Sequence, residues 1–285
     1  MDDANILILG AKGQLGTALS ARYPGARQTD QTELDITNFE SVNDFDWSGI
    51  KIILNAAAYT AVDAAETVEG RTSAWNVNAH AVANLSAIAS QHGITLVHIS
   101  TDYVFDGTSA PHSETESFAP LSVYGASKAA GDIAAGLTPN HYILRTSWVI
   151  GEGKNFVRTM LGLGARGISP SVVDDQIGRL TFTSELVRAI SHLLETNSPY
   201  GTYNVTNSGE SASWADITRQ IFLCAGHDLT VTGVTTQDYF KDKTGIAPRP
   251  LQSVLNLTKL QSTGFESLDW ETELQAYIKH ELEGV

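Results

Sequence analysis

The chain has 285 residues, of which 42% are hydrophobic and 18% charged, and its net charge is -14. These values are ordinary for a globular enzyme, and the negative charge argues against nucleic acid or an anionic membrane as a partner. The single cysteine, Cys224, excludes an intrachain disulfide and a cysteine-based metal site. An acidic start and the lack of a long apolar run indicate a cytoplasmic protein without a signal peptide.

Short apolar runs in the first half predict buried strands over residues 6–9, 52–54, 95–99 and 142–144. Helical spacing predicts helices over 14–23 and 73–91, and a further helix that carries Tyr124 and Lys128. Strands that alternate with helices predict an α/β fold, a Rossmann-type doubly wound parallel sheet.

The pattern loosens after residue 150, which suggests two unequal parts, 1–150 and 151–285. In the second part we expect a strand over 200–205 and helices over 183–194, 213–225 and 269–282. These elements predict a smaller α/β region, with chain crossings between the two parts.

Three glycines, Gly10, Gly13 and Gly16, follow the first strand and open the first helix. In this context they allow a tight turn, the approach of a pyrophosphate to the backbone, and close packing of helix on strand. The helix N-terminus then supplies N–H groups and a positive dipole to the phosphates. We therefore expect an NAD(P)-binding domain over 1–150 and a substrate-binding region over 151–285. The remaining expected contacts in this loop are Lys12, Gln14 and Leu15.

Asp30 lies about 20 residues beyond Gly10, where an acid can bind the ribose 2′-hydroxyl of NAD. It is equally well explained as a turn residue, and Lys12 offers a cation for the 2′-phosphate of NADP. The sequence thus leaves the choice between NADH and NADPH open. Further expected cofactor contacts are Asp35 and Ile36 at the adenine, and the run after the second strand, Asn55, Ala56, Ala57 and Ala58.

Tyr124 and Lys128 lie one helical turn apart, so a phenol and an ammonium share one helix face. A phenol ordinarily titrates near ~10. A cation held close should lower the pKa of Tyr124 and make it a tuned acid for a carbonyl oxygen. This pair is a weak signal alone and becomes strong beside the glycine motif and the run Ser100-Thr-Asp-Tyr103.

With these motifs in place, the chain closely resembles the dTDP-4-dehydrorhamnose reductase family of the extended short-chain dehydrogenase superfamily. The resemblance covers nearly the whole chain. Beyond the glycines and the Tyr124–Lys128 pair, it rests on five further runs: Asn55-Ala-Ala-Ala-Tyr-Thr-Ala-Val-Asp63, Ser100-Thr-Asp-Tyr-Val-Phe-Asp-Gly107, Arg145-Thr-Ser-Trp148, Asp175-Gln-Ile-Gly178 and Arg249-Pro-Leu-Gln-Ser253.

The resemblance implies that a reduced nicotinamide, NADPH or alternatively NADH, transfers hydride to C4 of dTDP-4-dehydro-6-deoxy-L-lyxo-hexose, a nucleotide-sugar substrate. Tyr124 would donate the proton, Lys128 would lower the Tyr124 pKa and bond the nicotinamide ribose, and Thr101 would hydrogen-bond the carbonyl oxygen. Asn78 matches a position that often shapes this active site through its backbone.

The substrate contacts implied by the resemblance are Val62, Asp102, Tyr103, Trp148, Asn155 and Arg249. Several of them have plainer structural explanations. Trp148 is a candidate core residue, Arg249 a candidate solvated loop charge, and Asp63 and Asp102 candidate cap or turn residues. An arginine fork nevertheless matches a nucleotide diphosphate well.

Some members of the family carry a glutamate that helps hold a divalent metal at a dimer interface, and here that position is Ala18. We therefore expect no bound metal, and a monomer or weak homodimer without a metal bridge, although Glu185, Glu281 and Glu283 remain acidic. Ile150, Arg179 and Leu180 also depart from the family pattern, in the substrate loops.

Two alternatives remain at this point. One is another nucleotide-sugar reductase or epimerase of the same fold, which net consumption of NAD(P)H on this substrate would distinguish. The other is a non-catalytic regulatory subunit similar to the β subunit of methionine adenosyltransferase, which a stoichiometric enzyme partner would reveal.

Overall fold

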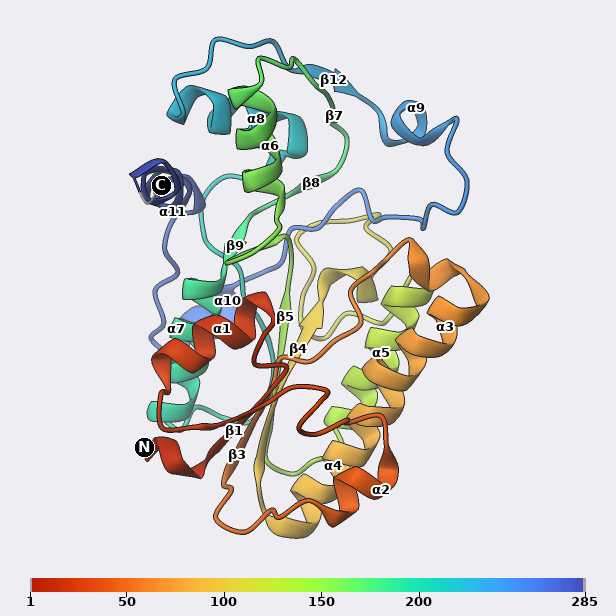
Figure 1. Cartoon of the computed structure of the whole chain (residues 1–285), viewed down its shortest axis with the longest axis vertical. Helices are drawn as coiled ribbons and strands as arrows, with labels where there is room; N and C mark the ends of the chain where they lie inside the picture. The colour runs from red at the N-terminus through yellow and green to blue at the C-terminus, as the bar shows by residue number, and fades with distance from the viewer. Residues whose placement is uncertain (1, 284–285) are drawn as a thin grey trace.

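The computed structural model describes residues 2–283, and a six-stranded, wholly parallel sheet forms its centre (Figure 1). Its strands, in spatial order, are β10 (Gly201–Asn204), β5 (His141–Thr146), β4 (Thr95–Thr101), β3 (Ile52–Asn55), β1 (Ile6–Leu9) and β2 (Arg27–Thr29). The order reverses beside β1, which pairs with β2 on one edge and β3 on the other. A ligand-binding crevice is expected at the carboxyl end of β1 for this reason.

Helices cover both faces of the sheet, as a doubly wound fold requires (Figure 1). One face carries α2 (Phe39–Asp44), α3 (Val68–Trp75), α4 (Ala81–His92) and α5 (Val123–Ala135); the other carries α1 (Gln14–Arg22), α7 (Thr183–Glu195) and α10 (Thr258–Gln261). The predicted Rossmann-type fold is confirmed.

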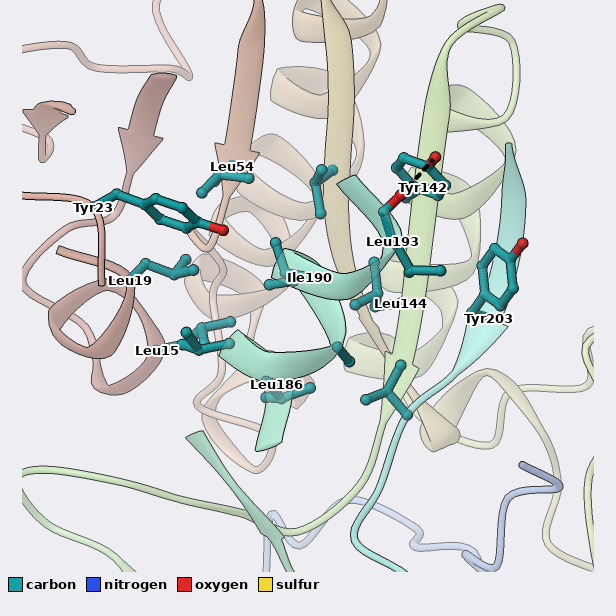
Figure 2. Packing of buried hydrophobic residues seen from close by; sticks show 14 of the residues in the cluster. Leu15, Leu19, Tyr23, Leu54, Tyr142, Leu144, Leu186, Ile190, Leu193 and Tyr203 are labelled. Carbon is teal, nitrogen blue, oxygen red and sulfur yellow. Dashed lines mark hydrogen bonds between the residues drawn. The ribbon is translucent and has the colours of Figure 1, made fainter. Parts of the chain in front are cut away.

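Alternation along β1 explains how this sheet is buried on both sides. Ile6 and Ile8 pack with α1 and α7, whereas Leu7 and Leu9 pack with α2 and α4. Figure 2 shows the first of these clusters, in which leucines of α1 and α7 meet Leu54 of the sheet.

The residues after 150 do not form a domain separate from the central sheet. Strand β10 pairs with β5 and completes the central sheet, and α7 packs on that sheet. The boundary at residue 150 therefore stays a prediction about function, and the sheet itself draws on residues beyond it.

A smaller lobe stands beyond the carboxyl ends of the strands, at the top of Figure 1. Its own buried cluster is built largely by α6, α8 and α11. Its elements are α6 (Phe156–Ala165), β7 (Ser171–Val173), α8 (Trp214–Cys224), β12 (Thr232–Val234), α9 (Thr236–Phe240) and α11 (Trp270–Glu283); short strands β6 (Val149–Ile150), β8 (Ile177–Gly178), β9 (Thr181–Phe182) and β11 (Ala212–Ser213) connect the lobes.

Two sequence expectations need correction. The helix expected over 73–91 begins at Val68 as α3, passes through a π-helical turn (Asn76–His80), and continues as α4. The short elements β2, α2 and α9 were not predicted, because segments of three to six residues carry little periodicity.

The packing in Figure 2 predicts the cost of a cavity. Leu186 on α7 is fully buried, so Leu186→Ala should lower the free energy of unfolding by about 2–5 kcal/mol in urea titrations. Leu223→Ala, on the exposed side of α8, is the matched control and should change it by less than about 0.5 kcal/mol. Equal effects of the two changes would contradict this description of the core.

Candidate active site

A cleft of about 350 Å³ lies at the carboxyl ends of β1, β2 and β3, at the reversal of strand order. Eight of the predicted cofactor residues line it: Gly10, Gly13, Asp30, Asp35, Ile36, Ala56, Ala57 and Ala58. They come from four separate stretches of the chain, so the fold brings together what the sequence could only assign piecewise.

The glycine loop has no room for side chains. Gly10 adopts φ +72°, and a Cβ there would lie 2.8 Å from the Ala57 nitrogen. A Cβ on Gly16 would lie 2.0 Å from the Gly10 oxygen, so only glycine lets α1 approach the loop. Gly13 is the N-cap of α1, and no side chain among the described residues caps that first turn. The free N–H groups and the bare backbone fit a pyrophosphate.

The other loop residues point elsewhere. Gln14 Oε1 accepts a hydrogen bond from the Gly151 nitrogen at 2.9 Å, and Leu15 is buried in the core, so Leu15 can serve a cofactor only through its backbone. Lys12 lies on the surface 3.7 Å from a carboxylate oxygen of Glu33. Asp30 accepts from the Gln31 nitrogen and remains on the cleft wall, which keeps it available to a ribose hydroxyl.

Two buried asparagines hold the loop that follows β3. Asn55 Nδ2 donates to His98 Nδ1 at 3.1 Å, and Asn55 Oδ1 accepts from the Ala57 nitrogen at 3.3 Å. Asn78 exchanges two hydrogen bonds with the Tyr59 backbone and donates a third to Ser127 on α5, at 3.0 Å. Asn78 stands in the π-helical turn, a distortion frequent at functional sites. It ties the cofactor cleft to the helix that carries Tyr124.

The three predicted catalytic residues meet where β4 ends and α5 begins. Ser122 caps α5 by accepting from the Gly125 nitrogen at 3.1 Å, which fixes the first turn that holds Tyr124. Lys128 is 2% exposed, and its Nζ donates to the Ile99 oxygen at 2.5 Å. Thr101, the last residue of β4, donates to Asp102 Oδ1 at 3.0 Å.

The expectation that Lys128 lowers the pKa of Tyr124 is wrong for this structure. Burial raises the pKa of Tyr124, Asp102 and Asp132 raise it further, and only a hydrogen bond with Thr101 lowers it. Burial also lowers the pKa of Lys128 to about 8. The two residues share α5 as expected, but burial is the largest influence on the pKa of each. Tyr124 is therefore a protonated phenol near neutral pH, which is the state a proton donor needs.

Asp102, predicted as a substrate contact, is 2% exposed and faces Thr101. Burial raises its pKa to about 6, against opposing hydrogen bonds from Ser253 and Thr101. Its neighbour Tyr103 packs edge-on against the Tyr124 ring, with centroids 5.6 Å apart. Tyr103 also lines a second pocket and so connects the proton donor with it.

The second pocket, of about 360 Å³, opens between the sheet and the smaller lobe. Of the predicted substrate residues, Tyr103 and Arg249 line it. Four aromatic residues that the sequence interpretation did not assign complete the wall: Phe156, Trp214, Tyr239 and Phe240. A pocket with apolar aromatic walls and a few polar groups is the usual form of a small-molecule site.

Trp148 supports this wall from behind. Its ring stacks on Trp214 with centroids 3.8 Å apart, and its backbone has φ +49°, a strained value for a residue with a side chain. A Cβ on Gly178 would lie 2.9 Å from the Trp148 ring, so that glycine makes room for it. Trp214 lines the pocket, and Trp148, the expected substrate contact, stacks on it.

Arg249 is not a solvated loop charge. Its Nη2 lies 2.9 Å from Asp63 Oδ2, its Nη1 donates to the Ala247 oxygen, and its guanidinium lies 5.0 Å from the Phe240 ring centroid. Burial alone would raise the Asp63 pKa, but hydrogen bonds from Arg249 and the Ala247 nitrogen lower it overall. The pair joins the loop after β3, where the half-buried Val62 also lies, to the loop before Ser253.

Asn155 lies away from the pocket wall. It caps α6 by accepting from the Arg158 nitrogen at 3.0 Å, and its Nδ2 donates to the Gly151 oxygen and the Tyr277 hydroxyl. Its predicted contact with substrate stays a prediction that these hydrogen bonds do not favour.

No group of three or more metal-ligating side chains occurs within residues 2–283. Glu185 pairs with Arg188, and Glu281 with Arg158, so arginines engage these two acidic residues. Within the same range, every helix is too short or too polar to span a bilayer.

A family model described as "RmlD substrate binding domain" matches residues 4–283. The chain belongs to this RmlD substrate binding domain family. Membership agrees with the resemblance drawn from the motifs, and with the pocket that faces the smaller lobe.

Three relatives of this family member carry informative names. A dTDP-4-dehydrorhamnose reductase of Aggregatibacter actinomycetemcomitans is 39% identical, over 95% of this chain and 97% of its own. A probable dTDP-4,6-dihydroxy-2-methyloxan-3-one 4-ketoreductase of Streptomyces antibioticus is 37% identical, over 94% and 92%. The crystal structure of a dTDP-4-dehydrorhamnose reductase of Bacillus anthracis in complex with NADP is 36% identical, with a TM-score of 0.88 over 97% and 98%.

The crowded glycine loop predicts the effect of a branched side chain in this RmlD family member. Gly13→Val should abolish binding of NADPH. A Cβ added at Gly13 would lie 3.3 Å from the Gly10 oxygen, and the rest of the valine side chain would occupy the path of the pyrophosphate. Titration of protein fluorescence with NADPH measures this. Gly162→Ala, at an open position on α6, is the control and should bind normally. Unchanged affinity in a folded Gly13→Val protein would contradict the placement of the pyrophosphate.

Proposed function

We propose that this protein reduces the C4 keto group of dTDP-4-dehydro-6-deoxy-L-lyxo-hexose to give dTDP-L-rhamnose, with NADPH as the reductant. The observation that carries the proposal is the position of Tyr124. Its helix is tied to the cofactor cleft by Asn78, and its ring contacts Tyr103, which lines the aromatic pocket. A hydride donor in the first site and a ketone in the second would thus meet beside a phenol.

The bound nicotinamide supplies the hydride, and the protein supplies orientation and proton transfer. Tyr124 donates its proton to the oxygen on which negative charge develops. Thr101 donates a hydrogen bond to that same oxygen in place of Asp102, and so stabilises the charge. Lys128 holds the nicotinamide ribose and contributes positive charge beneath the site.

The aromatic pocket would hold the deoxysugar and the thymidine. Trp214, Phe156, Tyr239 and Phe240 exclude water from the apolar faces of these groups. Arg249 stands at the same wall and would pair with the diphosphate through its planar fork of donors.

NADPH is the preferred cofactor in this proposal for two reasons. The Bacillus anthracis relative binds NADP, and Lys12 in the glycine loop is an exposed cation paired only loosely with Glu33, three residues beyond Asp30. NADH remains the alternative, because Asp30 can accept from a ribose 2′-hydroxyl.

A sister reduction is the second candidate. The Streptomyces antibioticus relative has the name of a ketoreductase for a different dTDP-sugar, at nearly the same identity. Both reactions would reduce a keto group of a dTDP-sugar, and the ketosugar that the aromatic wall of this protein admits would decide between them.

The remaining parts of the proposal concern the state of the protein. We place it in the cytoplasm, where nucleotide sugars and reduced nicotinamide are made, as a monomer or weak homodimer without a bridging metal. No nucleic acid or membrane partner is proposed, given the net charge of -14.

The reaction can be followed by the loss of NADPH absorbance at about 340 nm. On mixing with dTDP-4-dehydro-6-deoxy-L-lyxo-hexose we expect rapid loss, with dTDP-L-rhamnose as the product by chromatography. NADH in place of NADPH should react more slowly. Turnover of another dTDP-4-ketosugar alone would favour the sister reductase, and no turnover of any ketosugar by protein that binds NADPH would contradict both.

Tyr124→Phe tests the proton donor. It should reduce kcat by ~10² or more because it removes a general acid, and should leave NADPH affinity nearly unchanged. Tyr200→Phe, at an exposed tyrosine beside the amino end of β4, serves as the control and should keep full activity. A Tyr124→Phe enzyme as fast as the unmodified protein would place the proton donor elsewhere.

A further inference from the structure

Lys128 is buried, so it needs a nearby negative charge to keep its ammonium group protonated. The side chain is 2% exposed, and an ammonium in such surroundings tends to lose its proton. The carbonyl of Ile99 accepts one hydrogen bond from Lys128 Nζ but carries no charge. The proposed reaction requires the positive form of Lys128, so the source of compensating negative charge matters.

Asp132 is that source by position. It stands on α5, four residues beyond Lys128 and thus on the same helix face, and it is only 3% exposed. Burial is the largest influence on the Lys128 pKa and lowers it, while the charge of Asp132 raises it.

Arg145 favours the charged form of Asp132, although burial raises the pKa of this carboxyl overall. Arg145 on β5 donates through Nε to Asp132 Oδ2 at 2.9 Å. Burial raises the Asp132 pKa, and Arg145, Ser100 and Lys128 all oppose that rise. A guanidinium keeps its proton at any ordinary pH, so this contact favours the carboxylate.

The Arg145 guanidinium is in turn fixed on several sides. Its Nη1 donates to the backbone carbonyl of Glu114 at 3.0 Å. The guanidinium carbon lies 5.3 Å from the Phe105 ring centroid and 4.9 Å from that of Phe118. It cannot swing away without losing all three contacts, so the carboxylate of Asp132 has a rigid seat.

His98 on β4 completes the surroundings without adding charge. Its Nδ1 accepts from Asn55, so the proton sits on Nε2, which faces Asp132 Oδ1 at 4.0 Å. Burial and the nearby Lys128 both lower the His98 pKa, and the ring stays neutral. The charged or titratable groups that act on Lys128 are Asp132 of α5 and His98 of β4. Ser100 of β4 and Arg145 of β5 act on Asp132, and Asp102, just after β4, acts on Tyr124.

We propose that Asp132, seated by Arg145, is a positioning residue that keeps Lys128 protonated for its role at the cofactor. The inference rests on the proposed function in that Lys128 holds the nicotinamide ribose. It adds a pair of residues from α5 and β5 to the machinery of the reaction, neither of which touches the cofactor cleft or the aromatic pocket.

Asp132→Asn removes the charge and keeps the shape. Lys128 then loses the influence that raises its pKa, so it deprotonates at lower pH. In plots of kcat and of NADPH affinity against pH, we expect the alkaline limb to shift to lower pH by about one unit or more. Asp132→Glu keeps the charge and should restore most of the unmodified profile. Fluorescence titration with NADPH across pH gives the binding limb without any sugar substrate.

Two further variants separate this role from a purely structural one. Glu185→Gln removes another fully buried carboxylate that pairs with an arginine, far from Lys128, and should lower the melting temperature without moving either limb. If Asp132→Asn does not fold because Arg145 is left unpaired, Asp132→Asn with Arg145→Met removes both charges together, which folded proteins often tolerate. That double variant should show a downward shift of the same sign, smaller because the loss of the guanidinium charge favours the ammonium.

The outcomes are distinct. An unshifted binding limb in folded Asp132→Asn, or in the double variant, overturns the inference while leaving the reductase intact. A shift shared by Glu185→Gln overturns it as well, since the effect would then follow stability alone. Unmodified protein that binds no NADPH would instead contradict the proposed function itself.

Discussion

The site depends on how closely α5 approaches the end of β4 and the π-helical turn. A Cβ on Gly125 would lie 2.2 Å from the Tyr103 oxygen, and a Cβ on Gly131 would lie 2.1 Å from the Asn78 oxygen. Each helical glycine costs up to about 1 kcal/mol relative to alanine. The close approach that they permit sets Tyr124 beside Thr101 and buries Lys128. Helix stability is thus traded for the depth of the site.

The burial of Tyr124 and Lys128 explains why their pKa values differ from those that their spacing on the helix would predict. In water a phenol and an ammonium one turn apart would mainly attract each other's charged forms. Buried together, each is driven toward its neutral form, and the pKa of Tyr124 rises while that of Lys128 falls. A second layer of charge, from Asp132 and Arg145, is then needed to keep an ammonium in place. Asp132 and Arg145, which touch neither the cofactor cleft nor the aromatic pocket, are thus needed because Tyr124 and Lys128 are buried.

The sequence predicted what local patterns encode. Short runs of residues correctly predicted five of the six central strands, all except β2. The glycine motif predicted where the cleft lies. The aromatic wall was missed, because Phe156, Trp214 and Phe240 lie in three distant segments with no common motif. Trp148 was expected as a substrate contact or a core residue; in the structure its ring stacks on Trp214 of that wall, and its contact with substrate stays a prediction. The sign of the Tyr124 pKa shift was wrong because spacing does not reveal burial.

The ion pair between Asp63 and Arg249 connects the two halves of the site. Asp63 belongs to the loop that forms the wall of the cofactor cleft, and Arg249 belongs to the aromatic pocket. A diphosphate that takes up Arg249 under the proposed function must exchange with a carboxylate already 2.9 Å away. The gain in affinity is therefore smaller than a free guanidinium would give, because one ion pair replaces another. What the pair provides is a guanidinium already oriented against Phe240, so little side-chain freedom remains to be lost when the substrate arrives.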